Sequence, residues 1–351
     1  MFKRGQGICA ILTAVCLALF ALCAGCGQPA PKKIRLASIL LQNDEFFHMV
    51  SFGIHNAAQQ AGVELLEGIS EMKPEKEFEL VSTYTARKVD AILISPISKA
   101  GSVAALKQAY DKGITIITHN TPIDAEFSPA YIECNPTDLG QQTGQAARKY
   151  IQEKLGGKAK IAILAFKSQV PEQSDARVGG FKKEVLQLPG VEIVAEQDAW
   201  LAGPAVSKAG DILTAKPDVN LIYSANEGGT EGAVLAVQNA GKGGKIVVFG
   251  TDFNAQLLGF LLAPDDILQA ITAQRPVEVG RMAVEAALKV LRGEPVEKKT
   301  FLKGVLLSRE DPEAVKAFRK GLAVRTGPSI AEHHHVPVKR VLHVGTRVAD
   351  A

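Results

Sequence analysis

A buried strand that ends abruptly in polar residues constrains the fold of this chain more than any other stretch. Residues 246–249 are apolar and do not alternate with polar residues, so both faces of the strand must be covered, as in a parallel sheet flanked by helices. Gly250-Thr251-Asp252 follows directly. Ligands of open α/β sheets lie outside the carboxyl ends of strands, so Asp252 is placed to accept hydrogen bonds from a bound molecule. The alternative is that Asp252 only caps the next helix.

The length and the charge of the chain limit its class. A chain of 351 residues is long enough for two ordinary domains, each with its own core. The formal charge of +3 is small for this length, and no basic tract with interleaved aromatic residues is present. We therefore expect no nucleic-acid partner.

The first residues have the architecture of an export signal. A basic start and an apolar run over residues 8–23 precede Ala24-Gly25-Cys26, and a polar, Pro-containing stretch follows. The run is too short for a confident membrane span. The small residues before Cys26 resemble a bacterial lipobox, although Leu22 lies four residues before Cys26 where the usual pattern has Leu three before. We expect residues 1–26 to be a lipoprotein signal peptide and Cys26 to be lipidated; the alternative is a plain cleaved signal.

Cysteine usage agrees with export. After removal of the signal and lipidation of Cys26, only Cys134 remains in the body of the chain. We expect no intrachain disulfide. No Ser/His/Asp-like pattern accompanies Cys134, which favours a small buried residue over a nucleophile.

The chain repeats one pattern of strands and helices. Residues 90–95 (DAILIS) are echoed by 219–224 (VNLIYS), and residues 114–119 (ITIITH) by 247–252 (VVFGTD), each offset by about 130 residues. Two similar βαβ lobes are predicted, each a doubly wound parallel sheet. If the two ligand-facing edges oppose each other, their polar strand ends converge on one site.

The hydrophobic pattern assigns the individual segments. It predicts strands over residues 34–41, 63–66, 89–96, 114–117, 131–134, 160–166, 191–194, 219–226, 245–252, 267–274 and 305–307, and helices that begin near residues 44, 74, 98, 175, 205, 229 and 277. Asn43 or Asp44 caps the first helix. The pattern gives no structural prediction from residue 326 onward.

Five motifs in this order carry a family resemblance: residues 43–47 (NDEFF), 175–177 (DAR), 224–227 (SANE), 250–252 (GTD) and 272–276 (TAQRP). Over residues 34–308 the chain resembles the periplasmic ribose-binding-protein-like family, the type I solute receptors of sugar ABC importers. The resemblance implies two lobes that are joined by a three-strand hinge and close on a monosaccharide-sized ligand. The expected N-terminal lobe covers residues 34–133 and 275–303, the C-terminal lobe 134–274 and 304–322, and a tail of unknown structure 323–351.

The resemblance also assigns binding residues. The family's hydrogen-bonding Asn falls on Asn43, its stacking aromatics on Phe46 and Phe47, its second-lobe Arg on Arg177, its opposing aromatic on Trp200, and its Asn, Asp and Gln on Asn226, Asp252 and Gln274. Ribose-binding members have an Asp-Arg pair after the fourth strand, where this chain has His119-Asn120. The resemblance therefore gives no basis for naming ribose as the ligand.

Carbohydrate chemistry supports this set of residues. A sugar has C–H faces that need planar apolar walls and hydroxyls that need amides and charged groups in the plane. Phe46, Phe47 and Trp200 can supply the walls, and the polar edge can come from Asn43, Asn120, Arg177, Asn226, Asp252 and Gln274.

Each candidate also has a structural interpretation. Phe46 lies at a core spacing of its helix and Phe47 lies off that stripe, so Phe47 is expected to face the ligand. Arg177 could form a surface ion pair with Asp175, and Trp200 could fill a crevice. His119 could be a hydrogen-bonded strand-end histidine. The His tract at 333–335 is interpreted as a solvated tail rather than a metal site.

The sequence thus predicts a monomeric, lipid-anchored receptor on the outer face of the cytoplasmic membrane. It would capture a small neutral sugar or polyol by lobe closure and deliver it to an ABC permease and its ATPase, with no cofactor, no metal and no chemical reaction. An alternative is a sensory module that presents a sugar or quorum signal to a membrane kinase or chemoreceptor. A repressor's effector domain is disfavoured by the export signal. An enzyme is disfavoured because no nucleophile, metal or phosphate-loop motif is present.

Overall fold

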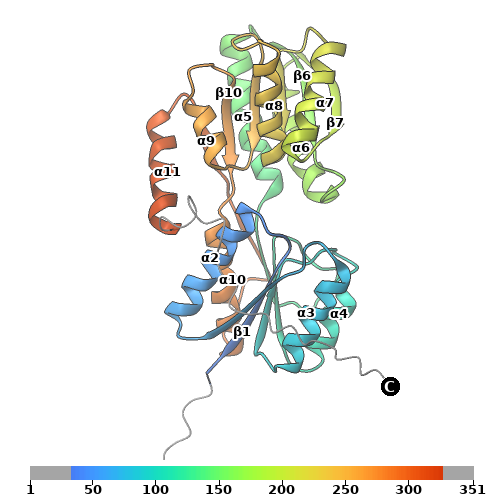
Figure 1. Ribbon diagram of the computed structural model, residues 1–351, viewed down its shortest axis with the longest axis vertical. Helices are drawn as coiled ribbons and strands as arrows, with labels where there is room; N and C mark the ends of the chain where they lie inside the picture. Colours follow the sequence, from blue (N-terminus) through green and yellow to red (C-terminus); the bar gives the residue numbers. More distant parts are fainter. Residues whose placement is uncertain (1–32, 327–351) are drawn as a thin grey trace, which may run out of the picture.

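The computed structural model describes residues 33–326, which form two α/β lobes stacked along the long axis of the molecule (Figure 1). Each lobe is built on a six-stranded sheet, with strand orders β11-β5-β4-β3-β1-β2 and β12-β10-β9-β8-β6-β7. Neighbouring strands are parallel except for the antiparallel pair β10 and β12. The predicted fold, two doubly wound parallel-sheet lobes, is confirmed.

The lobe that holds the first strand is called the N-lobe. It comprises β1 (Arg35–Leu40), α2 (Glu45–Gln60), β2 (Glu64–Ile69), α3 (Pro74–Ala86), β3 (Ala91–Ile94), α4 (Val103–Tyr110), β4 (Thr115–His119), β5 (Ala130–Cys134), α10 (Pro276–Leu291) and β11 (Lys299–Leu302). Helices α2 and α10 pack side by side on one face of its sheet, while α3 and α4 cover the other face (Figure 1).

The second lobe is called the C-lobe. It comprises α5 (Pro136–Lys154), β6 (Lys158–Ala165), α6 (Pro171–Val185), β7 (Gly190–Asp198), α7 (Ala202–Ala215), β8 (Leu221–Ser224), α8 (Glu227–Asn239), β9 (Val247–Thr251), α9 (Ala255–Leu262), β10 (Leu268–Ala273), β12 (Val305–Ser308) and α11 (Pro312–Thr326). Every residue of β9 is buried, as the continuous apolar run predicts.

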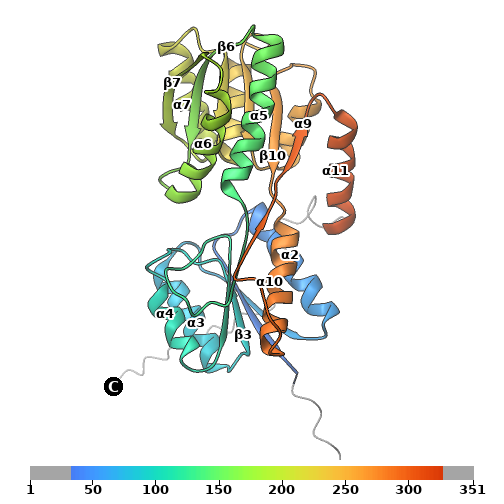
Figure 2. The same cartoon turned by 180° about the vertical axis from the view of Figure 1, so that it is seen from behind.

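Three segments connect the lobes (Figure 2). They lie between β5 and α5, between β10 and α10, and between β11 and β12. Pro136 and Pro276 stand at the first positions of the helices that follow two of these crossings, where a missing N–H carries no cost. The Asp138 carboxylate accepts a hydrogen bond from the backbone N–H of Gly304 at 2.9 Å, so it ties the first crossing to the third.

Four of the helices and strands in the two lobes have no counterpart in the sequence prediction: α5, α9, β11 and α11. Helix α5 shows the reason most clearly, because its buried face is mostly small or polar, with Gly140, Thr143 and Gly144 beside Leu139 and Ile151. Such a face gives little hydrophobic periodicity. Between residues 33 and 326, no helix combines the length and the apolarity that a membrane crossing requires. The predictions for residues 1–26, for Cys26 and for the His tract fall outside the described residues.

Candidate functional site

A cavity of about 470 Å³ lies between the two lobes. Nine of the ten residues that the sequence singled out for ligand contact line it: Asn43, Phe46, Phe47, Asn120, Arg177, Trp200, Asn226, Asp252 and Gln274. They come from the loop before α2 and the first turn of α2, from the ends of β4, β8, β9 and β10, from α6 and from the segment before α7. The carboxyl ends of strands of both sheets therefore meet at one place, as open α/β sheets require.

Two of these residues occupy equivalent turns of the two lobes. Asn120 follows β4 with φ 61°, and Asp252 follows β9 with φ 70°. Asn and Asp adopt this left-handed conformation more readily than other residues that carry a Cβ. Both side chains reach the cavity from these turns.

His119 is the exception among the predicted residues. Its side chain is fully buried in the N-lobe, does not line the cavity, and has no hydrogen-bond partner for either ring nitrogen among the described residues. Burial lowers the pKa of His119 to about 4, so the ring is neutral at physiological pH. The expectation that His119 contacts the ligand is therefore wrong, and so is the alternative of a hydrogen-bonded histidine. Neighbouring strand residues point to opposite faces, and the cavity-facing position is that of Asn120.

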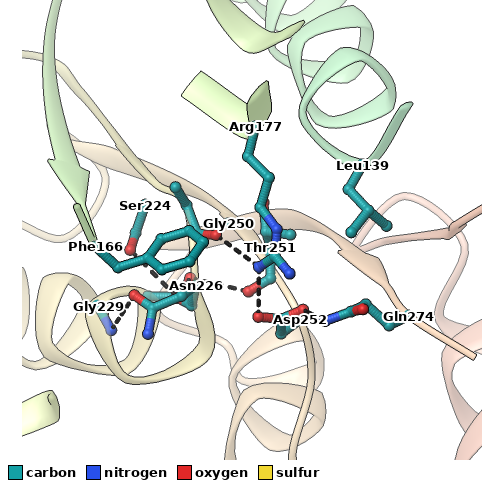
Figure 3. A network of polar contacts seen from close by, with 12 residues as sticks. Leu139, Phe166, Arg177, Ser224, Asn226, Gly229, Gly250, Thr251, Asp252 and Gln274 are labelled. Carbon is teal, nitrogen blue, oxygen red and sulfur yellow. Dashed lines mark hydrogen bonds and ion pairs between the residues drawn. The ribbon is translucent and has the colours of Figure 1, made fainter. Parts of the chain in front are cut away.

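Arg177, Asp252 and Gln274 form a buried polar network (Figure 3). Arg177 Nη1 donates to Asp252 Oδ2 at 2.8 Å and to the Ala225 carbonyl at 2.9 Å, and Gln274 Nε2 donates to Asp252 Oδ1 at 2.7 Å. The guanidinium also lies 5.0 Å from the centre of the Phe166 ring, a cation–π geometry. The proposed surface pair of Arg177 with Asp175 is not formed.

This network fixes the orientation of the Asp252 carboxylate. Each of its oxygens accepts one hydrogen bond, and an ionised carboxylate offers about four acceptor sites in all, so capacity remains for ligand hydroxyls. Arg177 is 3% exposed, and its Nε has no partner among the described residues. The cavity wall thus presents acceptor capacity at Asp252, whereas Arg177 Nε is itself buried.

The aromatic walls come from both lobes. Phe46 and Phe47 contact each other edge to face, with ring centroids 5.0 Å apart. Phe47 is buried in the N-lobe core whereas Phe46 is only partly buried, and both line the cavity. The prediction that Phe47 lies off the core stripe of α2 is wrong. The buried stripe of α2 begins at Phe47 and continues through Val50 and Ile54, which leaves Phe46 at its edge. Trp200 lies across the cavity and is partly buried.

All four predicted amides are already hydrogen-bonded. Gln274 donates to Asp252 as described above, and Asn120 Nδ2 donates to Ser95 Oγ at 3.4 Å. Asn226 is the N-cap of α8, and its Nδ2 donates to the Trp200 carbonyl at 2.8 Å. Asn43 is exposed, and its Oδ1 lies 2.6 Å from Nε2 of His48. The N-cap of α2 is Asp44, whose carboxylate accepts from the Phe47 N–H at 2.9 Å.

Sequence reasoning missed three acidic residues of the cavity wall: Asp44, Glu227 and Glu231. Asp44 and Glu227 stand inside two of the quoted motifs, next to the asparagines that were chosen. Burial raises the pKa of Asp44. The pKa of Glu227 is raised to about 8, mainly by burial and in addition by Asp252 and by carboxylates of the N-lobe. Their position directly after strand ends was the available signal.

Glutamines connect the lobes at the cavity. Gln173 Nε2, on α6, donates to the Asn120 carbonyl of the N-lobe at 2.6 Å. Gln169 Nε2 donates to Gln42 Oε1 at 3.5 Å. Sequence analysis gave no indication of these contacts, because they depend on how the lobes are placed.

Comparisons with known proteins agree with this architecture. A family model described as "Periplasmic binding protein domain" matches residues 38–295. The chain is 31% identical over 272 residues to the ABC transporter periplasmic-binding protein YphF of Escherichia coli K12, covering 75% of this chain and 82% of that protein. It is 27% identical over 262 residues to the ribose import binding protein RbsB of Bacillus subtilis 168, covering 74% of this chain and 82% of that protein.

A solved structure shows the same fold. An ABC transporter periplasmic solute-binding protein from Actinobacillus succinogenes 130z, with bound D-allose, superposes with a TM-score of 0.74 at 27% identity, covering 80% of this chain and all of that one. The family match spans most of the chain, and the two-lobed fold and the interlobe cavity agree with it. The chain therefore belongs to the periplasmic binding protein domain family and has the type I periplasmic binding protein fold.

Proposed function

We propose that this protein is an extracytoplasmic solute-binding protein that captures a monosaccharide or small polyol between its lobes and delivers it to an ABC importer. One observation carries the proposal: aromatic walls and a polar edge from both lobes line a single interlobe cavity. The named relatives, a ribose import binding protein and a solute-binding protein with bound D-allose, support the ligand class.

The mechanism follows from the geometry. Asp252, oriented by Arg177 and Gln274, accepts ligand hydroxyls on the C-lobe side, while Asn120 and Phe46 contact the ligand from the N-lobe. A ligand that touches both lobes binds the closed form better than the open form, so it shifts the population towards closure. The three connecting segments act as the hinge, and the permease recognises the closed form. No bond is made or broken.

The proposal also includes the location of the protein in the cell envelope and the bounds of its two lobes. Lipidation at Cys26 would hold a monomeric receptor on the outer face of the cytoplasmic membrane, beside the permease and its ATPase. The membership of β11 in the N-lobe sheet and of β12 in the C-lobe sheet supports lobes of residues 34–133 with 275–303 and 134–274 with 304–322.

Isothermal titration calorimetry against pentoses, hexoses, polyols and their amino derivatives tests the proposal. At least one member should bind, and Asp252→Asn should weaken it about 10- to 100-fold, the loss of one charge-assisted hydrogen bond. Glu192→Gln, on the exposed edge strand β7 and outside the cavity, is the matched control for lost charge and should bind as the parent does. If a folded protein that has been stripped of ligand binds no carbohydrate of the panel, the proposed function is wrong.

A further inference from the structure

The cavity wall carries more acidic than basic groups. Four carboxyl groups line it, those of Asp44, Glu227, Glu231 and Asp252, against one basic side chain, Arg177. Arg177 is already paired with Asp252 at 2.8 Å. Within residues 33–326, no ion pair joins the other three carboxyl groups to a lysine or arginine. Asp44 and the two glutamates therefore face the cavity without a cationic partner.

These acidic groups belong to opposite lobes. Asp44 caps α2 in the N-lobe, while Glu227 begins α8 in the C-lobe and Glu231 lies one turn further along that helix. Burial is the main cause of the raised pKa of Glu227; Asp252 in its own lobe and Glu45 and Asp44 in the other raise it further. Asp44 and Glu227 thus line one cavity from opposite lobes.

Neutral groups only partly compensate for this charge. Asn254 donates its amide to Glu227 Oε1 at 2.8 Å and to Glu231 Oε2 at 3.4 Å. Asp44 receives hydrogen bonds from Gln42 and from the Phe47 N–H, and His48 interacts with it favourably when protonated.

Closure of the two lobes increases the free-energy cost of keeping these carboxyl groups ionised. Bringing like charges together and removing water from them disfavours their ionised forms. A neutral sugar leaves that cost in place, whereas an ammonium group between the lobes offsets it with three N–H donors.

A second feature of the cavity points to the rest of the ligand. Arg177 is 97% buried, and its Nε has no partner among the described residues. That nitrogen is itself buried, and Nη1 already donates to Asp252 and to the Ala225 carbonyl. Arg177 lines the cavity, so the donor it offers to a ring hydroxyl or ring oxygen is Nη2. The cavity therefore has a donor side at Arg177 and an acceptor side at Asp44 and Glu227, which a compound that carries both hydroxyls and an ammonium would match.

We propose that the ligand is an amino sugar or amino polyol whose ammonium group lies between Asp44 of the N-lobe and Glu227 of the C-lobe. The inference rests on the proposed function and specifies its substrate class. Such a ligand bridges the two lobes by charge, so binding and closure are coupled.

Calorimetry on matched pairs tests the proposal: D-glucose with D-glucosamine, D-galactose with D-galactosamine and D-mannose with D-mannosamine, with N-acetylglucosamine as an uncharged amide. In the pair that binds, the amino sugar should bind about tenfold or more tightly at pH 7. Glu227→Gln and Asp44→Asn should each lower this ratio about tenfold, and Asn keeps the helix cap at position 44. Glu192→Gln should leave the ratio unchanged.

Proton linkage gives an independent readout. Glu227 is largely protonated at pH 7 in the ligand-free protein, because its pKa is raised to about 8. An adjacent ammonium favours the carboxylate, so amino-sugar binding should release up to about one proton. Titrations in buffers of different ionisation enthalpy measure this release, and Glu227→Gln should abolish most of it.

The outcomes separate the two proposals. Equal affinity within each pair, or proton uptake on amino-sugar binding, overturns the amino-ligand inference and leaves the carbohydrate receptor standing. Binding of neither member of any pair, nor of any other carbohydrate, overturns the proposed function itself.

Discussion

Asp252 is held by one hydrogen bond to each of its oxygens, from Arg177 and from Gln274. The side chains of Arg177 and Asp252 are 4% and 16% exposed. Removing water from both ions costs several kcal/mol, and their contact offsets this cost only while both partners remain. The main effect of the network is therefore to orient the Asp252 carboxylate, and the charges of the pair add little to the stability of the fold.

Loss of one partner of this pair should destabilise the fold strongly. We expect Arg177→Ala to lower the free energy of unfolding by about 3–5 kcal/mol, because a nearly buried carboxylate is left without its cation. Adding Asp252→Asn should restore part of the loss. Urea denaturation of both single variants and the double variant gives the coupling energy. Lys167→Ala, which removes the exposed pairs of Lys167 with Asp175 and with Glu196, both at 3.1 Å, should change stability by less than about 1 kcal/mol. Additive effects of Arg177→Ala and Asp252→Asn would contradict the network.

Glu227 should make ligand-free stability depend on pH. Its pKa is raised by burial from the model-peptide value of 4.5 to about 8 in the folded state. The folded protein therefore binds the proton more tightly than the unfolded chain, and this contribution is fully present below pH 4.5 and is lost as pH rises through about 8.

Glu227→Gln has no such loss. Relative to the parent, the free energy of unfolding of Glu227→Gln should rise between pH 5 and 9 and level off above that, by up to about 5 kcal/mol for a shift from 4.5 to about 8. Thermal denaturation across this range measures the difference between the two proteins. A difference that is constant with pH would show that Glu227 titrates normally.

Nine of the ten residues predicted to contact a ligand line the interlobe cavity, and the tenth, His119, stands one position before Asn120, which lines it. The sequence left the cap of α2 open between Asn43 and Asp44; Asp44 forms it, and both residues line the cavity. A shift of one residue reverses the face on which a strand residue lies. The hydrophobic pattern of a strand does not show at which residue the chain turns. The turn is at the residue with positive φ after the strand, such as Asn120 after β4, and only the structure shows that angle.

The helix pair α2 and α10 in the N-lobe and the pair α5 and α6 in the C-lobe both pack closely through glycines. Gly53 of α2 and Gly280 of α10 lie so close that a Cβ on either would be about 2 Å from backbone oxygen of the other helix. Gly140 of α5 and Gly180 of α6 repeat this arrangement in the C-lobe, where a Cβ on Gly140 would lie 1.8 Å from the Arg177 carbonyl. The backbone of Arg177 is thus positioned by the contact between α5 and α6.

Adjacent glycines of α6 offer a matched test. A Cβ on Gly180 would lie 2.4 Å from the Thr137 carbonyl, whereas a Cβ on Gly179 has no neighbour within 4 Å. Gly180→Ala should destabilise the protein by about 1–3 kcal/mol by overpacking and weaken ligand binding through Arg177. Gly179→Ala should stabilise the helix by about 0.5–1 kcal/mol. Chemical denaturation of the two variants provides the comparison, and equal effects would show that the helices do not pack as described.

The same packing explains which segments the sequence could predict. Central strands such as β3 and β9 are continuous apolar runs because helices cover both faces. Helix α5 was missed because a close helix contact selects glycine and threonine, and these residues do not produce an apolar stripe. Two-lobed architecture followed from the internal repeat, but the width of the cleft depends on contacts between lobes that no local pattern encodes.

We expect one such contact to limit how far the cleft opens. Gln173 Nε2 of the C-lobe donates to the Asn120 carbonyl of the N-lobe at 2.6 Å. A neutral hydrogen bond contributes about 1 kcal/mol net, which corresponds to about a fivefold shift between closed and open forms. The apparent affinity for ligand scales with the fraction of protein in the closed, binding-competent form. A smaller closed fraction therefore weakens binding through the equilibrium between the two forms, with no lost contact to the ligand.

Gln173→Ala should therefore enlarge the ligand-free protein and weaken binding about fivefold. Small-angle X-ray scattering should give a larger radius of gyration for the variant without ligand and the parent value at saturating ligand, because the closed form itself is unchanged. Gln238→Ala removes a comparable bond, from Gln238 to Asp265 at 2.8 Å within the C-lobe, and should leave both quantities as they are. If Gln173→Ala weakens binding at an unchanged ligand-free radius of gyration, Gln173 contacts the ligand directly and the two lobes are not coupled through it.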